Sequence, residues 1–126
     1  MFENADVISI YTRADAIADG TLVDLSGNFP DLCGIYRYPV ACTAAVWALV
    51  EMAVSNKRHG NDYQGVVWDI LYMSQRGVIR RPDPAICIFQ VIITGTGRRR
   101  LHTFKVVCGP GDDGEPVVTI MFPHED

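Results

Sequence analysis

The last third of the chain reads as three strands joined by two glycine-rich turns, and this pattern constrains the fold most. AICIFQVIIT (85–94) is nearly all apolar, which predicts a strand covered on both faces. LHTFKVVC (101–108) and PVVTIMF (116–122) each alternate, which predicts one buried face per strand, with Phe104 and Val118 among the inward residues. Because the connections are short, the three strands are expected to pair antiparallel as a meander.

The first two thirds predict short strands and helices. VISIYT (7–12) and TLVDLS (21–26) are β-branched runs typical of strands. Between them Thr12 stands as a helix N-cap, with Asp15 in the capping-box position and Gly20 as the stop. Two longer helices are predicted, over 41–56, which is apolar nearly all round, and over 62–77, which carries an apolar stripe at helical spacing.

These elements predict a single α+β domain over residues 1–126. It would have a β-α-β start, two central helices and a C-terminal three-stranded antiparallel meander, with the helices mainly on one side. A chain of 126 residues has room for one core. No stretch reaches the roughly 18 apolar residues of a membrane span, and the start lacks the pattern of a signal peptide, so we expect a cytoplasmic protein with no membrane partner.

Cysteine and histidine spacing gives no sign of a metal or a cofactor. No CxxC, HxxxH or HExxH pattern occurs, and no phosphate-binding loop is present. We expect no metal site and no cofactor, and we expect the cysteines to be reduced thiols that pack as small hydrophobes. These are Cys33, Cys42, Cys87 and Cys108.

The loop CGPGDDGE places three carboxylates, Asp112, Asp113 and Glu115, between two strand-like runs. Adjacent acids do not match the alternating ligands of an EF-hand loop, nor the opposed carboxylates of a glycosidase. Asp113-Gly114 is a typical hairpin turn. The loop is therefore predicted to be a turn whose carboxylates are a candidate contact surface for a partner.

Charge is segregated along the chain. Residues 57–105 carry nine Lys or Arg against three acids, whereas the flanking segments are acidic and the net charge is −4. The basic residues form three clusters, which are Lys57, Arg58 and His59, then Arg76, Arg80 and Arg81, then Arg98, Arg99 and Arg100. If the clusters converge, they make a patch for an anionic protein face or nucleic acid; otherwise they are solvated turns. Aromatic residues do not interleave with the arginines, as base stacking would require.

The second predicted helix offers a further candidate surface. Asp69 and Tyr72 lie away from its apolar stripe and are candidates for a partner contact. Trp47 and Trp68 are expected to be core aromatics.

The blocks IYTRADAIADGTLVDLS, YPVACTAAVW, WDILYM and VCGPGDDGEPVVTIMFPHED resemble an uncharacterised family of small proteins carried by phages, plasmids and their bacterial hosts. The resemblance spans nearly the whole chain. It implies an accessory protein of a mobile element, a setting in which some small proteins block host defence, anti-CRISPR inhibitors among them. It implies no catalytic residues.

The opening, with Tyr11, Thr12 and Arg13 before a short helix and then Asp19-Gly20, is similar to the start of some ADP-ribosyltransferase domains. That likeness implies an NAD-using enzyme with Arg13 as a binding residue. The sequence departs from the pattern, because the usual histidine is replaced and no Ser-Thr-Ser strand or late Gln-x-Glu follows.

The main functional hypothesis is therefore a non-enzymatic interaction protein that binds a host or phage protein complex through its charged turns. Inhibition of host defence is the finer form of this hypothesis. The partner-binding candidates are Asp112, Asp113, Glu115, Arg98, Arg99 and Arg100. The alternatives are a small NAD-using enzyme and a nucleic-acid-binding regulator.

Overall fold

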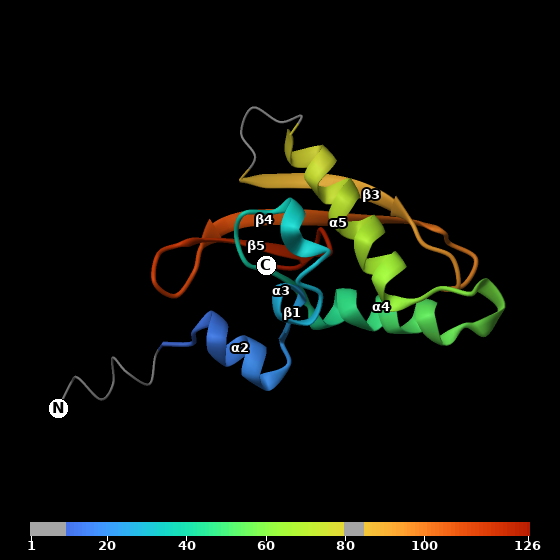
Figure 1. Cartoon of the computed structure of the whole chain (residues 1–126), viewed down its shortest axis with the longest axis horizontal. Helices are drawn as coiled ribbons and strands as arrows, with labels where there is room; N and C mark the ends of the chain where they lie inside the picture. The colour runs from blue at the N-terminus through green and yellow to red at the C-terminus, as the bar shows by residue number, and fades with distance from the viewer. Residues whose placement is uncertain (1–9, 80–84) are drawn as a thin grey trace.

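A computed structural model of the chain describes residues 10–79 and 85–126 (Figure 1). The described residues form a five-stranded sheet in the order β1-β2-β5-β4-β3, with helices packed against it. The strands are β1 (Leu22–Asp24), β2 (Val40–Thr43), β3 (Ile86–Ile92), β4 (Leu101–Pro110) and β5 (Pro116–Met121). The α-helices are α2 (Arg13–Asp19), α3 (Leu25–Asn28), α4 (Ala44–Ser55) and α5 (Tyr63–Ile79), and two short 3-10 helices cover Cys33–Ile35 and Lys57–His59. The predicted α+β class is confirmed.

The C-terminal meander is present as predicted. β3 pairs antiparallel with β4, and β4 pairs antiparallel with β5. Phe104 of β4 lies opposite Phe89 of β3, and Val106 lies opposite Ile120 of β5. Because strand side chains alternate, these four point to the same face, where Phe104, Val106 and Ile120 have no solvent exposure. This face carries the core.

The expectation that the first strand of the meander is covered on both faces is wrong. Cys87, Phe89 and Val91 are buried, but Ile86 and Ile92 are 54% and 67% exposed. The reason lies in the layering, since α4 and α5 pack on the core face of the sheet and none of the described residues covers β3 on the other (Figure 1). An apolar run can thus mark an open face as well as a doubly covered strand.

The first helix begins and ends as predicted. Thr12 and Asp15 make a reciprocal capping box, and Gly20 closes α2 with a left-handed φ of 87°. The predicted strand over 7–12 falls largely outside the described residues, and Ile10 to Thr12 are not in a strand. The predicted strand over 21–26 is shorter than expected, because the Asp24 side chain accepts the Gly27 amide and starts α3.

A central strand, β2, replaces the start of the predicted helix over 41–56. All of its residues are buried, and it runs parallel to β5, with Val40 opposite Val118. A fully buried strand shows no alternation of apolar and polar residues. The sequence pattern of Val40 to Thr43 therefore could not be distinguished from that of the apolar helix that follows. Thr43 separates the two, because its side chain accepts the Val46 amide and caps α4.

Helix α5 follows its predicted stripe, with one difference at its end. The buried residues of the stripe are Val66, Val67, Ile70, Leu71 and Ser74. Gly77 does not stop the helix, which continues to Ile79. A Cβ atom at Gly77 would lie 2.9 Å from the Cys87 sulfur, so this glycine permits the close approach of α5 to β3. No helix among the described residues is long and apolar enough to cross a membrane.

Candidate functional site

The two predicted charged turns lie at opposite ends of β4. The arginine turn joins β3 to β4 just before Leu101, and the acidic turn follows β4 after Pro110. Ten residues of strand separate them, which corresponds to about 30 Å at the usual rise per residue. The acidic and basic candidates therefore belong to two separate surfaces (Figure 1).

Two of the three basic clusters converge at one end of the molecule. The loop from α4 to α5 lies against the β3–β4 turn, where the Asn56 side-chain amide donates to the Gly95 carbonyl at 3.4 Å. The Asn61 amide donates to the Thr94 carbonyl at 3.0 Å and to Ala53 at 3.3 Å. We call this surface the basic end; it comprises Lys57, Arg58, His59, Arg98, Arg99 and Arg100, all exposed.

Close packing holds the arginine turn in place. Gly95 has a φ of 89°, and a Cβ atom there would lie 3.1 Å from the Ala53 carbonyl oxygen. Thr96 contacts the His102 ring at 2.9 Å between Oγ1 and Nε2. Burial and the nearby Arg99 charge lower the pKa of His102, which favours a neutral ring beneath the turn.

The cations of the basic end are free to act on a partner. Lys57, Arg58 and the three arginines form no ion pair with a carboxylate in the described part of the chain. Arg76 lies apart from them, near the C-terminal end of α5, and Arg80 and Arg81 fall outside the described residues. Sequence reasoning found the charges of this site but missed Asn56 and Asn61, because a bond between distant loops leaves no local pattern.

The acidic turn is largely occupied by internal contacts. Asp112 accepts the backbone amides of Arg13 and Ala14 at 2.7 and 3.0 Å, one on each carboxylate oxygen. It thereby joins the β4–β5 turn to the start of α2, next to the Thr12 cap. Glu115 accepts the Asp113 amide at 3.2 Å within the turn. Of the three predicted carboxylates only Asp113 has a side chain without a hydrogen-bond partner among the described residues.

Arg13 is half-buried and is also held by internal contacts. Its guanidinium donates to Thr119 Oγ1 at 2.7 Å and to the Val118 carbonyl at 2.9 Å. Burial lowers its pKa, against the opposing effect of the Asp112 charge. Since Thr119 alternates with the core residues Val118 and Ile120, Arg13 fastens α2 to the face of the sheet opposite α4 and α5.

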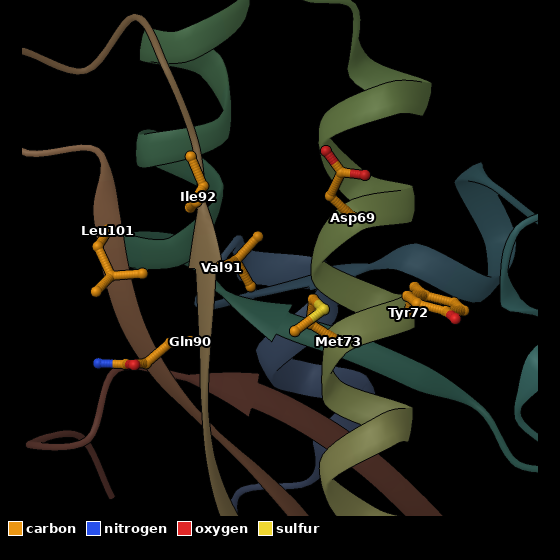
Figure 2. Close-up of a pocket in the computed structure, with 7 residues that line it drawn as sticks. All are labelled: Asp69, Tyr72, Met73, Gln90, Val91, Ile92 and Leu101. Carbon is orange, nitrogen blue, oxygen red and sulfur yellow. The ribbon is translucent and has the colours of Figure 1, made fainter.

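A groove runs between α5 and the outer edge of β3 (Figure 2). It consists of two adjoining hollows of about 490 and 440 Å³, and Tyr72, Met73 and Gln90 line both. Figure 2 shows Met73 and Val91 pointing toward each other between the helix and the strand. Asp69 lies at the Ile92 end of the groove, and Arg76 lies at the Ile88 end.

The two residues of α5 that were predicted as partner contacts, Asp69 and Tyr72, are both exposed and line this groove. Trp68 was expected to be a core aromatic, but its side chain is 37% exposed.

The described residues offer little for thiol or metal chemistry. Cys33, Cys42 and Cys87 are buried and Cys108 is half-buried. Burial raises the pKa of Cys42 to about 12, so its thiolate is scarce at neutral pH. No group of three or more His, Cys, Asp or Glu in the described ranges could hold a metal ion.

Comparison with known proteins gives a family but no described activity. No curated protein and no solved structure matches the chain. A family match covers residues 1–126, the full length of the sequence. The chain therefore belongs to the family described as "Family of unknown function (DUF6573)".

Proposed function

We propose that this chain is a non-enzymatic interaction protein that docks its basic end on an acidic face of a protein complex. The observation that carries the proposal is the convergence of Lys57, Arg58 and Arg98 to Arg100 from two loops distant in sequence. Five exposed cations without carboxylate partners among the described residues create a local positive field, although the net charge of the chain is −4.

Rigidity supports binding at the basic end. The Asn56, Asn61 and Thr96 contacts fix the backbone that carries the arginines, so less conformational freedom is lost when a partner binds. Arginine also suits this task because its planar guanidinium binds carboxylates through two parallel hydrogen bonds.

A protein partner fits this charge distribution better than a nucleic acid does. The far end of β4 carries Asp113 and Glu115, both exposed, so a long polyanion would be repelled as it extended across the molecule. The resemblance to proteins of phages and plasmids supports a finer form of the proposal. In that form the chain acts in the cytoplasm of a bacterial host and inhibits a host defence complex.

Capture from bacterial lysate tests the proposal. We expect the tagged chain to retain a partner that is lost, on the order of a hundredfold, when Arg98, Arg99 and Arg100 are changed to glutamate. The matched controls are Arg37→Glu, an exposed arginine away from the basic end, and Asp113→Lys, which changes charge at the acidic turn. Both controls should keep the partner. Retention by the triple variant would contradict the proposal.

Two further measurements distinguish the alternatives. Binding to DNA that falls steeply with salt would favour a nucleic-acid regulator. A rise in melting temperature with millimolar NAD would favour an NAD-using enzyme. The internal contacts of Arg13 with Thr119 and Val118 speak against the second alternative, because a guanidinium used for NAD would have to leave them.

A further inference from the structure

No strand among residues 10–79 and 85–126 pairs with the outer edge of β3. In the β3–β4 ladder the hydrogen-bonded positions are the odd-numbered residues, as the bond from the Ile93 amide to the Arg100 carbonyl shows. The backbone N–H and C=O groups of Ile86, Ile88, Gln90 and Ile92 therefore point away from β4. Apart from a long 3.5 Å contact from the Cys87 sulfur to the Ile88 carbonyl, these groups have no hydrogen-bond partner among the described residues.

This edge lacks the usual protection against pairing. Natural edge strands carry charges, prolines or bulges that prevent addition of another strand. Residues 86–97 contain no charged residue and no proline, and β3 is a regular strand of seven residues. The side chains of the outward residues add an exposed apolar face, with Ile88 and Ile92 at 53% and 67% exposure. The edge and the face together favour an occupant that forms a strand.

The groove beside this edge is self-complementary in charge. Tyr72 and Met73 line both hollows, and so mark its middle. Asp69 and Arg76 lie on either side of them, seven residues apart on α5, about 10 Å along a helix. Burial raises the pKa of the Asp69 carboxyl, which pairs with no cation in the described part of the chain. A partner with the reverse order of charges would pair with both groups.

We propose that the occupant is a second copy of this chain, paired antiparallel through β3 about a two-fold axis near Phe89. In the register that uses all of β3, Ile86 lies opposite Ile92 of the second copy, and Ile88 lies opposite Gln90. The four outward residues of each copy then form hydrogen-bonded pairs, and the sheet becomes continuous across ten strands. Both copies keep the same side chains on the open face, because the register preserves the alternation.

The same axis brings the two grooves together. α5 runs alongside β3, so each Asp69 faces Arg76 of the second copy, and the pair occurs twice. Tyr72 and Met73 of the two copies meet at the axis and fill the hollows from both sides. Helices across such an interface pack at about 8–10 Å, a distance that Met and Tyr side chains span.

Light scattering during size-exclusion chromatography tests the assembly. At about 100 µM, a concentration at which modest interfaces are populated, the full-length chain should have about twice its 14.0 kDa mass. Gln90→Pro should give a monomer, because proline removes an outward N–H without touching the β3–β4 ladder. Ile88→Lys should do the same, whereas Met52→Lys, at a 52% exposed position on α4, should remain a dimer. Circular dichroism checks that each variant is folded.

Charge exchange identifies the interface. Asp69→Arg and Arg76→Asp, singly, should each weaken the dimer by on the order of tenfold, since each creates like charges twice. The double variant should restore the wild-type dissociation constant. Amide hydrogen exchange should show protection of Ile86, Ile88, Gln90 and Ile92 that grows with protein concentration.

Two outcomes overturn the proposal. A full-length chain that stays monomeric at this concentration would show that no second copy occupies the edge, whether another segment of the chain or another protein does. A dimer that survives both Gln90→Pro and Ile88→Lys would place the interface elsewhere. Neither outcome bears on the basic end, which lies beyond Ile92 and is tested by its own variants.

Discussion

At the scale of single residues, the acidic turn shows how neighbours with the same chemistry take different roles. Asp112 and Asp113 are adjacent and equally acidic, yet only Asp112 reaches the amides at the start of α2. The sequence marks both as turn residues, and the helix that Asp112 caps begins 99 positions earlier in the chain. No local pattern could distinguish them, because the distinction arises from packing between the two ends of the sequence.

Substitution of these two residues gives a matched pair. Asp112→Ala should lower the free energy of unfolding by about 1–2 kcal/mol, the usual effect of losing a helix cap. Asp113→Ala should change it by less than about 0.5 kcal/mol, as for an exposed residue without contacts. Urea unfolding with unchanged m-values measures both. Equal effects would show that the Asp112 contacts do not stabilise the fold. The comparison also shows why a binding test at this turn should use Asp113.

At the scale of elements, local sequence signals predicted four pieces of the fold, most directly α5 and β4, whose burial is one-sided. α5 and β4 follow their apolar periods, α2 lies between its predicted cap and its glycine stop, and β5 alternates in sequence although Val117 and Met121 bury its second face; each element was found close to its expected bounds. β2 was missed and β3 was given the wrong environment, because an all-apolar segment has the same pattern whether it is central or at an open edge. Strand order decides whether such a segment is central or at an edge, and here the parallel pairing of β2 with β5 helps to set that order.

The contact between α5 and β3 gives a prediction at this scale. Alanine at Gly77 should gain about 1 kcal/mol in helix propensity, but its Cβ would press on the Cys87 sulfur. We therefore expect Gly77→Ala to destabilise the wild-type chain by about 1 kcal/mol and to stabilise the Cys87→Ala variant. The measurement is a double-mutant cycle of unfolding free energies at fixed protein concentration, since association also stabilises the fold. Additive effects would contradict the close contact.

At the scale of the whole molecule, the charge pattern of the sequence became informative only after folding. The segregation into acidic and basic segments was visible in the sequence, but the assignment of clusters to surfaces was not. Lys57 to His59 and the arginine turn meet because α4 and β3 end at the same side of the sheet, while α5 carries Arg76 away. The sequence thus predicted the charged residues of the candidate site and its arginine turn. It did not predict that the loop with Lys57 to His59 lies beside that turn.

Docking through the basic end and pairing through β3 together predict a dimer with two binding surfaces. β3 ends beside the basic end, so antiparallel pairing of β3 with its copy places the two basic ends at opposite sides of the ten-stranded sheet. A dimer would then present two cationic surfaces, and separate chains on an immobilised heparin column could each contact one of them, which raises apparent affinity without any new contact. We expect wild type to elute from a heparin column at higher salt than Gln90→Pro, a substitution that leaves the charge unchanged. Loss of Arg98 to Arg100 should lower the salt concentration at which both proteins elute.

If Gln90→Pro is monomeric yet elutes at the same salt concentration as wild type, the two basic ends act independently. In that case dimerisation would serve the stability of the β3 edge and would not increase binding by the basic ends.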